Sequence, residues 1–355
     1  STQNAIFTER TTSVYEATED ITGLYWEQSV VWDRWTLIFG FRYEKTENTF
    51  TNLEILTRDP ESDQFISPGF WRFLEPQQFS RLVTRERDYD DWLPALHLRR
   101  DIGDDMVFRA SVTQTIARPR FDDVDAREIP SIDGAQFGTS IRLPSFDLQP
   151  MESTNYDVSL EKYFEPIGVV YAGAFYKDLD GPVYDEVRLA VGPNEETEPF
   201  AEKYNSRGFN SDPWTFVQKK NAGAAELYGV EFALDRRLDF LPSPLDGLGI
   251  QGNIAFFESE VELLTEERIS PEIPGSNGET FEVDPTVPLF EQPDRTANLS
   301  LYFEKYGIFA RISYNLRGTY LDRVYAGEDV GRLITIDEDP GGLDRYIDDT
   351  ERIDV

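Results

Sequence analysis

Cysteine is absent from this 355-residue sequence, and histidine occurs once, as His97. The lack of cysteine excludes disulfides, thiol nucleophiles and cysteine metal sites. A single histidine excludes a histidine-rich metal site and argues against a Ser-His-Asp triad. We therefore expect no metal, no other cofactor and no enzymatic activity.

Long apolar runs are also missing, since none approaches the roughly 18 residues that a membrane helix requires. If the chain crosses a bilayer, it must do so as strands. Aromatic residues (14%) and hydrophobic residues (39%) are nevertheless abundant. Such a composition is too rich in apolar side chains for a disordered protein, so we expect a large ordered structure.

Basic residues are scarce: 34 lysines and arginines stand against 67 aspartates and glutamates, a formal net charge of −33. Binding to nucleic-acid phosphates needs a basic face, so the sequence argues against nucleic acid as a partner. Two interpretations of the acidity stay open. Acidic loops solvate a surface and repel neighbours, or the charge has a role related to a ligand.

Alternation of apolar and polar residues is the most informative pattern present. Between residues 106 and 116, one parity is apolar and the other is mostly polar; the apolar set is Met106, Phe108, Ala110, Val112 and Ile116. Residues 35–43 repeat the pattern. A period of two indicates a β-strand with one apolar and one wet face. Strands of about nine to eleven such residues suit a membrane-spanning barrel, whereas soluble sandwiches use shorter ones.

Short and long connections alternate between the expected strands. The short ones are 33–34, 101–105, 165–168, 241–247 and 305–307. The long ones are 52–87, 119–152, 182–222, 264–293 and 320–344. Outer-membrane barrels have short periplasmic turns and long extracellular loops, so the alternation predicts strand ends in two compartments. Aromatic residues at or beside the short turns are expected to form an interfacial girdle: Trp32, Trp35, Tyr163, Phe164, Phe240 and Tyr306.

Charged residues recur on the parity opposite the apolar one. The candidates for lining a polar lumen are Arg42, Glu44, Arg109, Asp157, Glu161, Glu231 and Arg311. About ten full strands and the start of another are expected, whereas plugged outer-membrane transporters have about 22. The predicted fold is therefore all-β: a partial antiparallel transmembrane β-barrel, with residues 1–355 as one barrel fragment.

Four stretches, in order along the chain, resemble motifs of the TonB-dependent outer-membrane receptors. They are Ala110–Phe121 (ASVTQTIARPRF), Leu148–Asp157 (LQPMESTNYD), Phe175–Asp180 (FYKDLD) and Leu227–Phe232 (LYGVEF). Residues 240–252 and 294–321 also resemble the branch of this family common in Caulobacter- and Xanthomonas-like bacteria. The Arg118-Pro119 pair in the first stretch marks a strand leaving the membrane, where proline is tolerated.

The resemblance implies location in the outer membrane of a Gram-negative bacterium and energy-coupled uptake of a scarce solute. It also implies that the N-terminal plug and the final strand of the barrel lie outside these residues. The implied partners are membrane lipid, the TonB–ExbB–ExbD complex acting through the missing plug, and a small-molecule or oligosaccharide ligand. The charged lumen residues named above would then face the lumen or the plug.

Aromatic residues in the long loops are the candidates for ligand contact: Trp71, Phe73 and Trp214. Aromatic faces pack against sugar rings, which favours an oligosaccharide as the ligand. A ferric siderophore and a passive porin-like barrel are the alternative functions. An enzymatic barrel that uses His97 and a soluble secreted β-protein are the remaining rivals.

Overall fold

The computed structural model describes most of the chain in ten segments. These are residues 15–55, 80–121, 123–124, 129–132, 139–143, 145–165, 168–190, 214–263, 286–326 and 345–354. Two sheets are formed, one large and one small. Within these segments no helix is long and apolar enough to cross a membrane.

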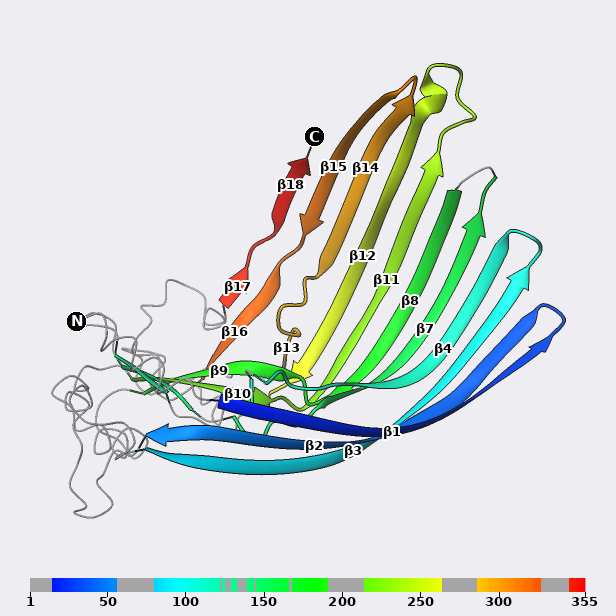
Figure 1. Ribbon diagram of the computed structural model, residues 1–355. Coiled ribbons are helices and arrows are strands. Elements are labelled where there is room, and N and C mark those ends of the chain that lie inside the picture. The colour runs from blue at the N-terminus through cyan, green and yellow to red at the C-terminus, as the bar shows by residue number, and fades with distance from the viewer. Residues whose placement is uncertain are drawn as a thin grey trace, which may run out of the picture.

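The larger sheet, called the wall below, is antiparallel throughout and contains 12 strands (Figure 1). Eleven of them follow one another in chain order: β1 (Tyr15–Trp32), β2 (Trp35–Ile55), β3 (Ser80–Ile102), β4 (Met106–Ala117), β7 (Met151–Tyr163), β8 (Gly168–Asp180), β11 (Ala224–Arg237), β12 (Leu248–Glu262), β14 (Arg295–Lys305), β15 (Ile308–Arg317) and β18 (Thr350–Asp354). The twelfth, β13 (Thr286–Val287), pairs with β12. The prediction of about ten long strands and the start of another is confirmed.

Five short connections join neighbouring strands of the wall where they were predicted, and four of them lie together at one end of the wall (Figure 1). Residues 166–167 of the fifth, between β7 and β8, lie outside the described residues. The connection between β14 and β15 shows why this chain can turn so sharply. Its two residues, Tyr306 and Gly307, have φ values of 57° and 76°. Positive φ at both central positions is the geometry of a type I′ turn, whose twist matches that of the flanking strands.

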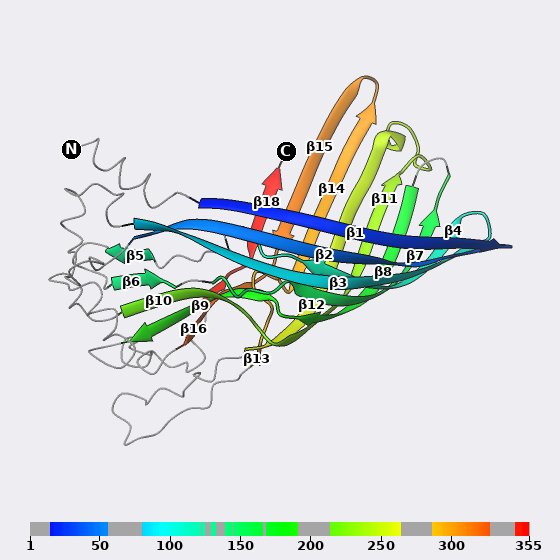
Figure 2. The same cartoon turned by 60° about the horizontal axis from the view of Figure 1, so that its bottom comes forward.

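The long connections differ from the prediction because they contain strands of their own. Their strands form the smaller sheet, called the loop sheet below: β5 (Ile129–Ile132), β6 (Thr139–Arg142), β9 (Val183–Ala190), β10 (Trp214–Asn221), β16 (Tyr320–Ala326) and β17 (Arg345–Ile347). The predicted loop 52–87 is also too long, since β2 continues to Ile55 and β3 starts at Ser80. Figures 1 and 2 show the loop sheet at the end of the wall opposite the short turns.

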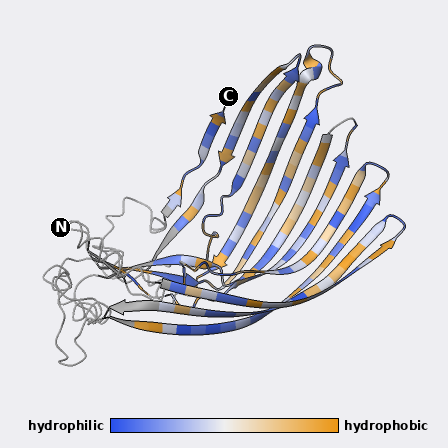
Figure 3. Cartoon of the chain, in the orientation of Figure 1, coloured by the Kyte–Doolittle hydropathy of each residue, from blue (hydrophilic) through white to orange (hydrophobic). Residues whose placement is uncertain are grey.

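Strand register divides the wall into an outer and an inner face, because residues directly opposite each other share a face. One outer row crosses six strands: Leu98, Ala110, Val158, Ala174, Val230 and Phe256. Large apolar side chains of this face are exposed, including Val158 (43%), Val230 (40%) and Leu299 (50%). Figure 3 shows the resulting alternation of hydropathy along the strands. We call this exposed apolar zone the apolar belt.

The loop sheet packs against the inner face of the wall. Val183 of β9 packs against a cluster around Phe50 of β2. The next residue, Tyr184, belongs to a second cluster with Leu179 of β8 and Val261 of β12. Val183 and Tyr184 are adjacent on β9, yet they pack against strands that lie far apart in the wall, β2 on one side and β8 and β12 on the other. The inner face is therefore the concave one.

An arginine in the apolar belt is expected to destabilise the wall far more than one on the inner face. Ala110 and Ser111 are neighbours on β4, but Ala110 faces outward and Ser111 lies against Asp157 on the inner face. Ala110→Arg places a charge in hydrocarbon and should cost about 2–4 kcal/mol. Urea unfolding of the protein from lipid vesicles measures the effect.

Ser111→Arg is the matched control, since its guanidinium can pair with the Asp157 carboxylate. It should cost less than about 1 kcal/mol. Equal destabilisation by the two variants would contradict the assignment of the two faces.

Candidate functional site

A pocket of about 450 Å³ lies where the inner face of the wall meets the base of the long connections. Its volume falls in the range of small-molecule sites. The polar lining residues are Thr115, Arg118, Arg120, Asp123, Ser153, Asn155, Lys177 and Gln292. Its apolar lining includes Leu179, Leu227, Leu289 and Phe290. Three cations against one carboxylate make this pocket locally basic in a chain whose net charge is −33.

Arg118 fastens the connection that follows β4 to the wall. Its guanidinium donates to the Glu44 carboxylate and to Thr46 Oγ1, the latter at 3.3 Å. Both partners lie on β2, so the side chain reaches across the inner face of β3. Arg42 donates to the other Glu44 oxygen. Three of the predicted lumen and motif residues therefore form one network, which we call the Arg118 latch.

Because this network is buried, its stability depends on how its charges are paired. Glu44 is 7% exposed, and it lies directly opposite Asp91, which is 8% exposed. Two carboxylates at such close positions repel each other and destabilise the sheet. The positive charges of Arg118 and Arg42 offset that repulsion. Pro119, the second motif residue, lines the pocket beside the latch.

A second set of ion pairs joins the connection after β4 to the loop sheet. Lys219 Nζ of β10 lies 3.0 Å from Asp185 Oδ1 of β9 and 3.5 Å from Asp123 Oδ1. Arg120 Nε lies 3.2 Å from Asp123 Oδ2. Burial raises the pKa of Asp123, but hydrogen bonds from Arg120 and the charge of Lys219 outweigh it. The net effect holds the pKa of Asp123 below its ordinary value of 3.8.

Asn221, at the end of β10, binds two other connections. Its Nδ2 donates to the carbonyl oxygens of Gly181 at 2.7 Å and of Gln149 at 3.0 Å. Its Oδ1 accepts from the Gln149 N–H at 2.8 Å. The sequence analysis did not identify Asn221. The only local feature that marks it is its position before Ala-Gly at the end of a strand.

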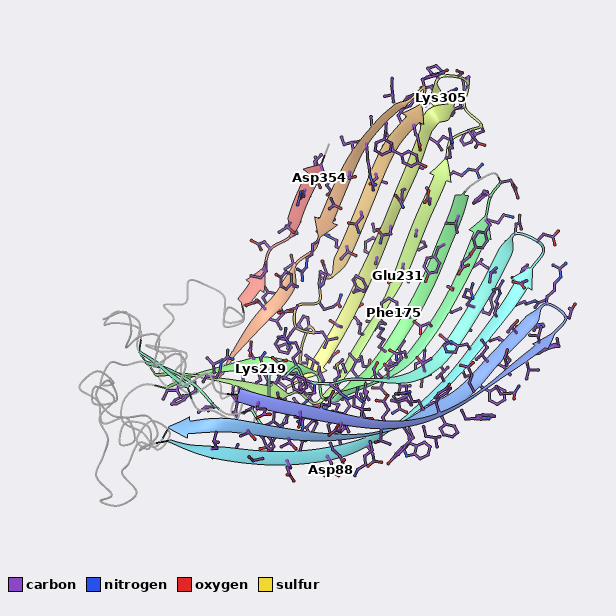
Figure 4. All side chains as sticks on the ribbon, in the orientation of Figure 1. Asp88, Phe175, Lys219, Glu231, Lys305 and Asp354 are labelled. Atoms are coloured by element: carbon purple, nitrogen blue, oxygen red, sulfur yellow. The ribbon has the colours of Figure 1, made fainter. Side chains whose placement is uncertain are left out.

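The remaining predicted lumen residues share the inner face but do not form one cluster. Arg109 Nε lies 2.9 Å from Glu161 Oε1, and Ser111 Oγ lies 3.4 Å from Asp157 Oδ2. Arg311 donates to Ser300 at 2.9 Å and to Ser313 at 3.1 Å, several strands away. Glu231 lies on the same face of β11, and Figure 4 shows it near Phe175 along the middle of the wall.

One expectation about the aromatic girdle is wrong. Tyr163 was expected at the lipid interface, but its hydroxyl donates to Glu161 Oε2 at 2.6 Å. The reason is parity: Tyr163 and Glu161 are two residues apart on β7 and therefore share the inner face. Trp32 and Trp35 do lie together at a turn, with ring centroids 6.2 Å apart.

The predicted ligand-contact residues are not brought together in the described part of the chain. Trp71 and Phe73 lie outside the described residues. Trp214 begins β10, opposite Ala190 of β9, and its side chain is outside the described set. Lys177 and Asn155 of the pocket lie within two of the quoted motifs, but the motifs alone assign them no role. No group of described side chains could hold a metal ion.

Comparison with known families gives one match that covers nearly all of the chain. A model described as TonB dependent receptor-like, beta-barrel matches residues 1–343. No curated protein matches the sequence.

Solved structures share the fold at low identity. The closed form of the ferric-catecholate import receptor Fiu from E. coli K12 is 8% identical (TM-score 0.55), with 95% of this chain and 38% of that one covered. The siderophore receptor PiuA from Acinetobacter baumannii is 10% identical (TM-score 0.53), with 96% and 36% covered. The ferric yersiniabactin uptake receptor FyuA from Yersinia pestis is 14% identical (TM-score 0.50), with 96% and 38% covered. This chain thus spans less than two fifths of each structure.

Loss of the Arg118 latch is expected to loosen the connection after β4. Arg118→Ala leaves buried Glu44 with Arg42 as its remaining cation, and should destabilise this segment by about 1.5–3 kcal/mol. Hydrogen exchange at the N–H groups of Asp123 and Val124, which both donate to Arg120 O, reports the loosening.

Arg109→Ala is the control on the same face, because the pair with Glu161 is more exposed. It should cost no more than about 1 kcal/mol and leave those two N–H groups protected. Unchanged protection in Arg118→Ala would show that the latch does not hold the segment.

Acid is expected to release the same segment through Asp123. Because the folded pKa of Asp123 lies below 3.8, its ion pairs stabilise the docked segment above that pH. This contribution is lost as the pH falls through the lowered folded value. Exchange protection at Val124, corrected for the intrinsic rate, should therefore drop in wild type at strongly acidic pH. In Asp123→Asn it should already be reduced at neutral pH; an Asp123→Asn variant with wild-type protection there would refute this role.

Proposed function

Because the chain belongs to the family of TonB-dependent receptor β-barrels, we propose that it forms part of the barrel of a receptor that imports a scarce solute by energy-coupled transport. Barrels of this family are outer-membrane proteins of Gram-negative bacteria, and the chain is one of them. They are transporters and not enzymes. The proposed partners of the whole receptor are membrane lipid, a solute, and the TonB–ExbB–ExbD complex acting through a plug.

The contrast between the two faces of the wall is the observation that supports this proposal most. The outer face exposes the apolar belt, which suits contact with hydrocarbon. The inner face has charges such as Arg109, Asp157 and Glu231, which suit a lumen or a plug. The loop sheet lies across one end of that concave face, where a solute arriving from outside the cell would first meet the protein.

The ligand we favour is an anionic ferric complex. Arg118, Arg120 and Lys177 line the pocket. Arg118 and Arg120 already pair with Glu44 and Asp123, so the Lys177 ammonium is the main candidate to bind carboxylate or catecholate oxygens through a charged hydrogen bond. The solved receptors Fiu and FyuA are named for ferric-catecholate and ferric yersiniabactin uptake. The oligosaccharide alternative depends on Trp71, Phe73 and Trp214, whose side chains are outside the described part of the chain.

Neutralising Lys177 is expected to weaken uptake of a ferric siderophore. Lys177→Gln removes one charged hydrogen bond, so KM for iron uptake by cells should rise about tenfold. Arg99→Gln is the control, since Arg99 lies on the same face near the opposite end of the wall. A protonophore should stop uptake, whereas a passive porin would continue to conduct.

Gene expression separates the two ligand classes. Iron starvation should induce the parent gene, and a glycan carbon source should not. Induction by a glycan, together with glycan uptake and no response to iron, would replace the ferric ligand by an oligosaccharide. Uptake that continues under the protonophore would overturn energy-coupled transport itself.

A further inference from the structure

The pocket that Lys177 lines has a polar side and an apolar side. Strand register sets out both sides, because residues directly opposite each other share a face. Asn155 of β7 lies opposite Lys177 of β8, and Lys177 lies opposite Leu227 of β11. One row nearer to the loop sheet, Ser153 of β7 lies opposite Leu179 of β8. Hydrogen-bonding side chains therefore stand on one side of Lys177 and apolar side chains on the other.

The polar side chains of this lining are already engaged with protein groups. Asn155 Nδ2 donates to Thr115 Oγ1 at 3.0 Å, and Ser153 Oγ donates to Asn155 Oδ1 at 2.9 Å. Gln292 Nε2 donates to the carbonyl oxygen of the next residue at 3.1 Å. Both arginines of the lining are held in ion pairs. A ligand rich in hydroxyl groups would have to compete with these contacts, which disfavours an oligosaccharide in this pocket.

Lys177 differs from the other charged residues of the lining. Within the described part of the chain its ammonium forms no ion pair and no hydrogen bond. Its Nζ lies 5.8 Å from the centroid of the Phe175 ring, on the neighbouring inward position of the same strand. It is thus the one charged group of the described lining that is free to bind a ligand, and an ammonium binds an anionic oxygen.

The apolar side of the pocket is mostly aliphatic. Its lining residues include Met151, Leu179, Leu227, Leu289 and Phe290. Leu179 and Leu289 belong to a buried cluster, and the other three pack against it with part of their surface exposed. One face of the Phe290 ring is covered by Tyr184, with the two centroids 5.1 Å apart. This lining suits an alkyl chain, which gains from burial against any apolar surface, better than an aryl group, which gains most from stacking on a free ring.

We propose that the ligand of this pocket is a ferric complex that carries an alkyl chain: an anionic group of the complex binds Lys177, and the chain lies against Leu227 and the apolar residues around it. Lys177 and Leu227 are directly opposite, so their Cβ atoms are only about 5 Å apart and one ligand can reach both. This inference rests on the proposed function, since it names the class of ferric complex. A free fatty acid has the same two chemical features, so the test includes one.

The test measures the Kd of two radioactive ferric complexes for cells that produce the protein, with a protonophore present to stop uptake. Both probes are citrate dihydroxamates of the same charge; one carries acetyl groups and the other carries octanoyl groups. Cells that lack the protein give the background to be subtracted. The octanoyl complex should bind about tenfold more tightly or better, because burial of about two methylene groups is enough for a tenfold gain.

Leu227→Gln should reduce this preference to less than about threefold, because a polar amide replaces the apolar surface under the chain. Lys177→Gln should weaken both probes by the same factor, since both carry the same anionic centre. Leu93→Gln is the matched control: Leu93 is half-buried on the inner face of β3, opposite Arg42, and does not line the pocket. It should keep the full preference. If Leu227→Gln does not fold, Met151→Gln should lower the preference in its place.

Equal affinity of the wild type for the two probes, or a full preference in the apolar-side variant, would overturn the alkyl site and leave the proposed ferric ligand standing. Octanoate that competes as well as the octanoyl complex does would replace the ferric complex by a fatty acid. A wild type that binds neither ferric complex would overturn the ferric ligand of the proposed function, and this inference with it. The failures of the two proposals therefore give different results.

Discussion

Satisfying backbone hydrogen bonds inside hydrocarbon is the constraint on which the rest of this structure depends. A bilayer offers no water to unpaired N–H and C=O groups, so strands can cross it only when each is paired with its neighbours. The antiparallel register runs from β1 through β15 to β18. Since successive side chains of a strand point to opposite faces, this pairing also separates the apolar belt from the charged inner face.

Much of the wall can be predicted from the sequence, because the patterns that specify its strands and turns lie within short stretches of the chain. The bounds of β4 and β15 follow directly from the alternation of apolar and polar residues, and the turn at Tyr306-Gly307 follows from glycine. The loop sheet cannot be predicted this way. Its strands have three to eight residues, and pairs such as β10–β6 and β16–β9 join different connections, so no local pattern specifies them.

The candidate site illustrates the same limit. Parity places Arg42, Glu44 and Glu231 on the inner face, but it does not reveal that Arg118 reaches across β3 to Glu44. Net charge was equally uninformative about local charge. The chain has a formal charge of −33, yet Arg118, Arg120 and Lys177 outnumber the one carboxylate that lines the pocket. Asp178, Glu226 and Glu260 lie side by side on the outer face instead. Carboxylates on the outer face of the wall therefore do not exclude an anionic ligand in the pocket.

The division of the wall into a lipid face and a lumen face is the central claim, and spin labelling along β12 tests it most directly. Because the sequence has no cysteine, single cysteines can be introduced at each position from Gly249 to Phe257. In vesicles, labels at Ile250, Ile254 and Phe256 should be most accessible to oxygen, which dissolves in lipid. Labels at Gln251 and Asn253 should be most accessible to a water-soluble nickel complex. Accessibility to both reagents rising and falling in phase, or without a period of two, would contradict the account.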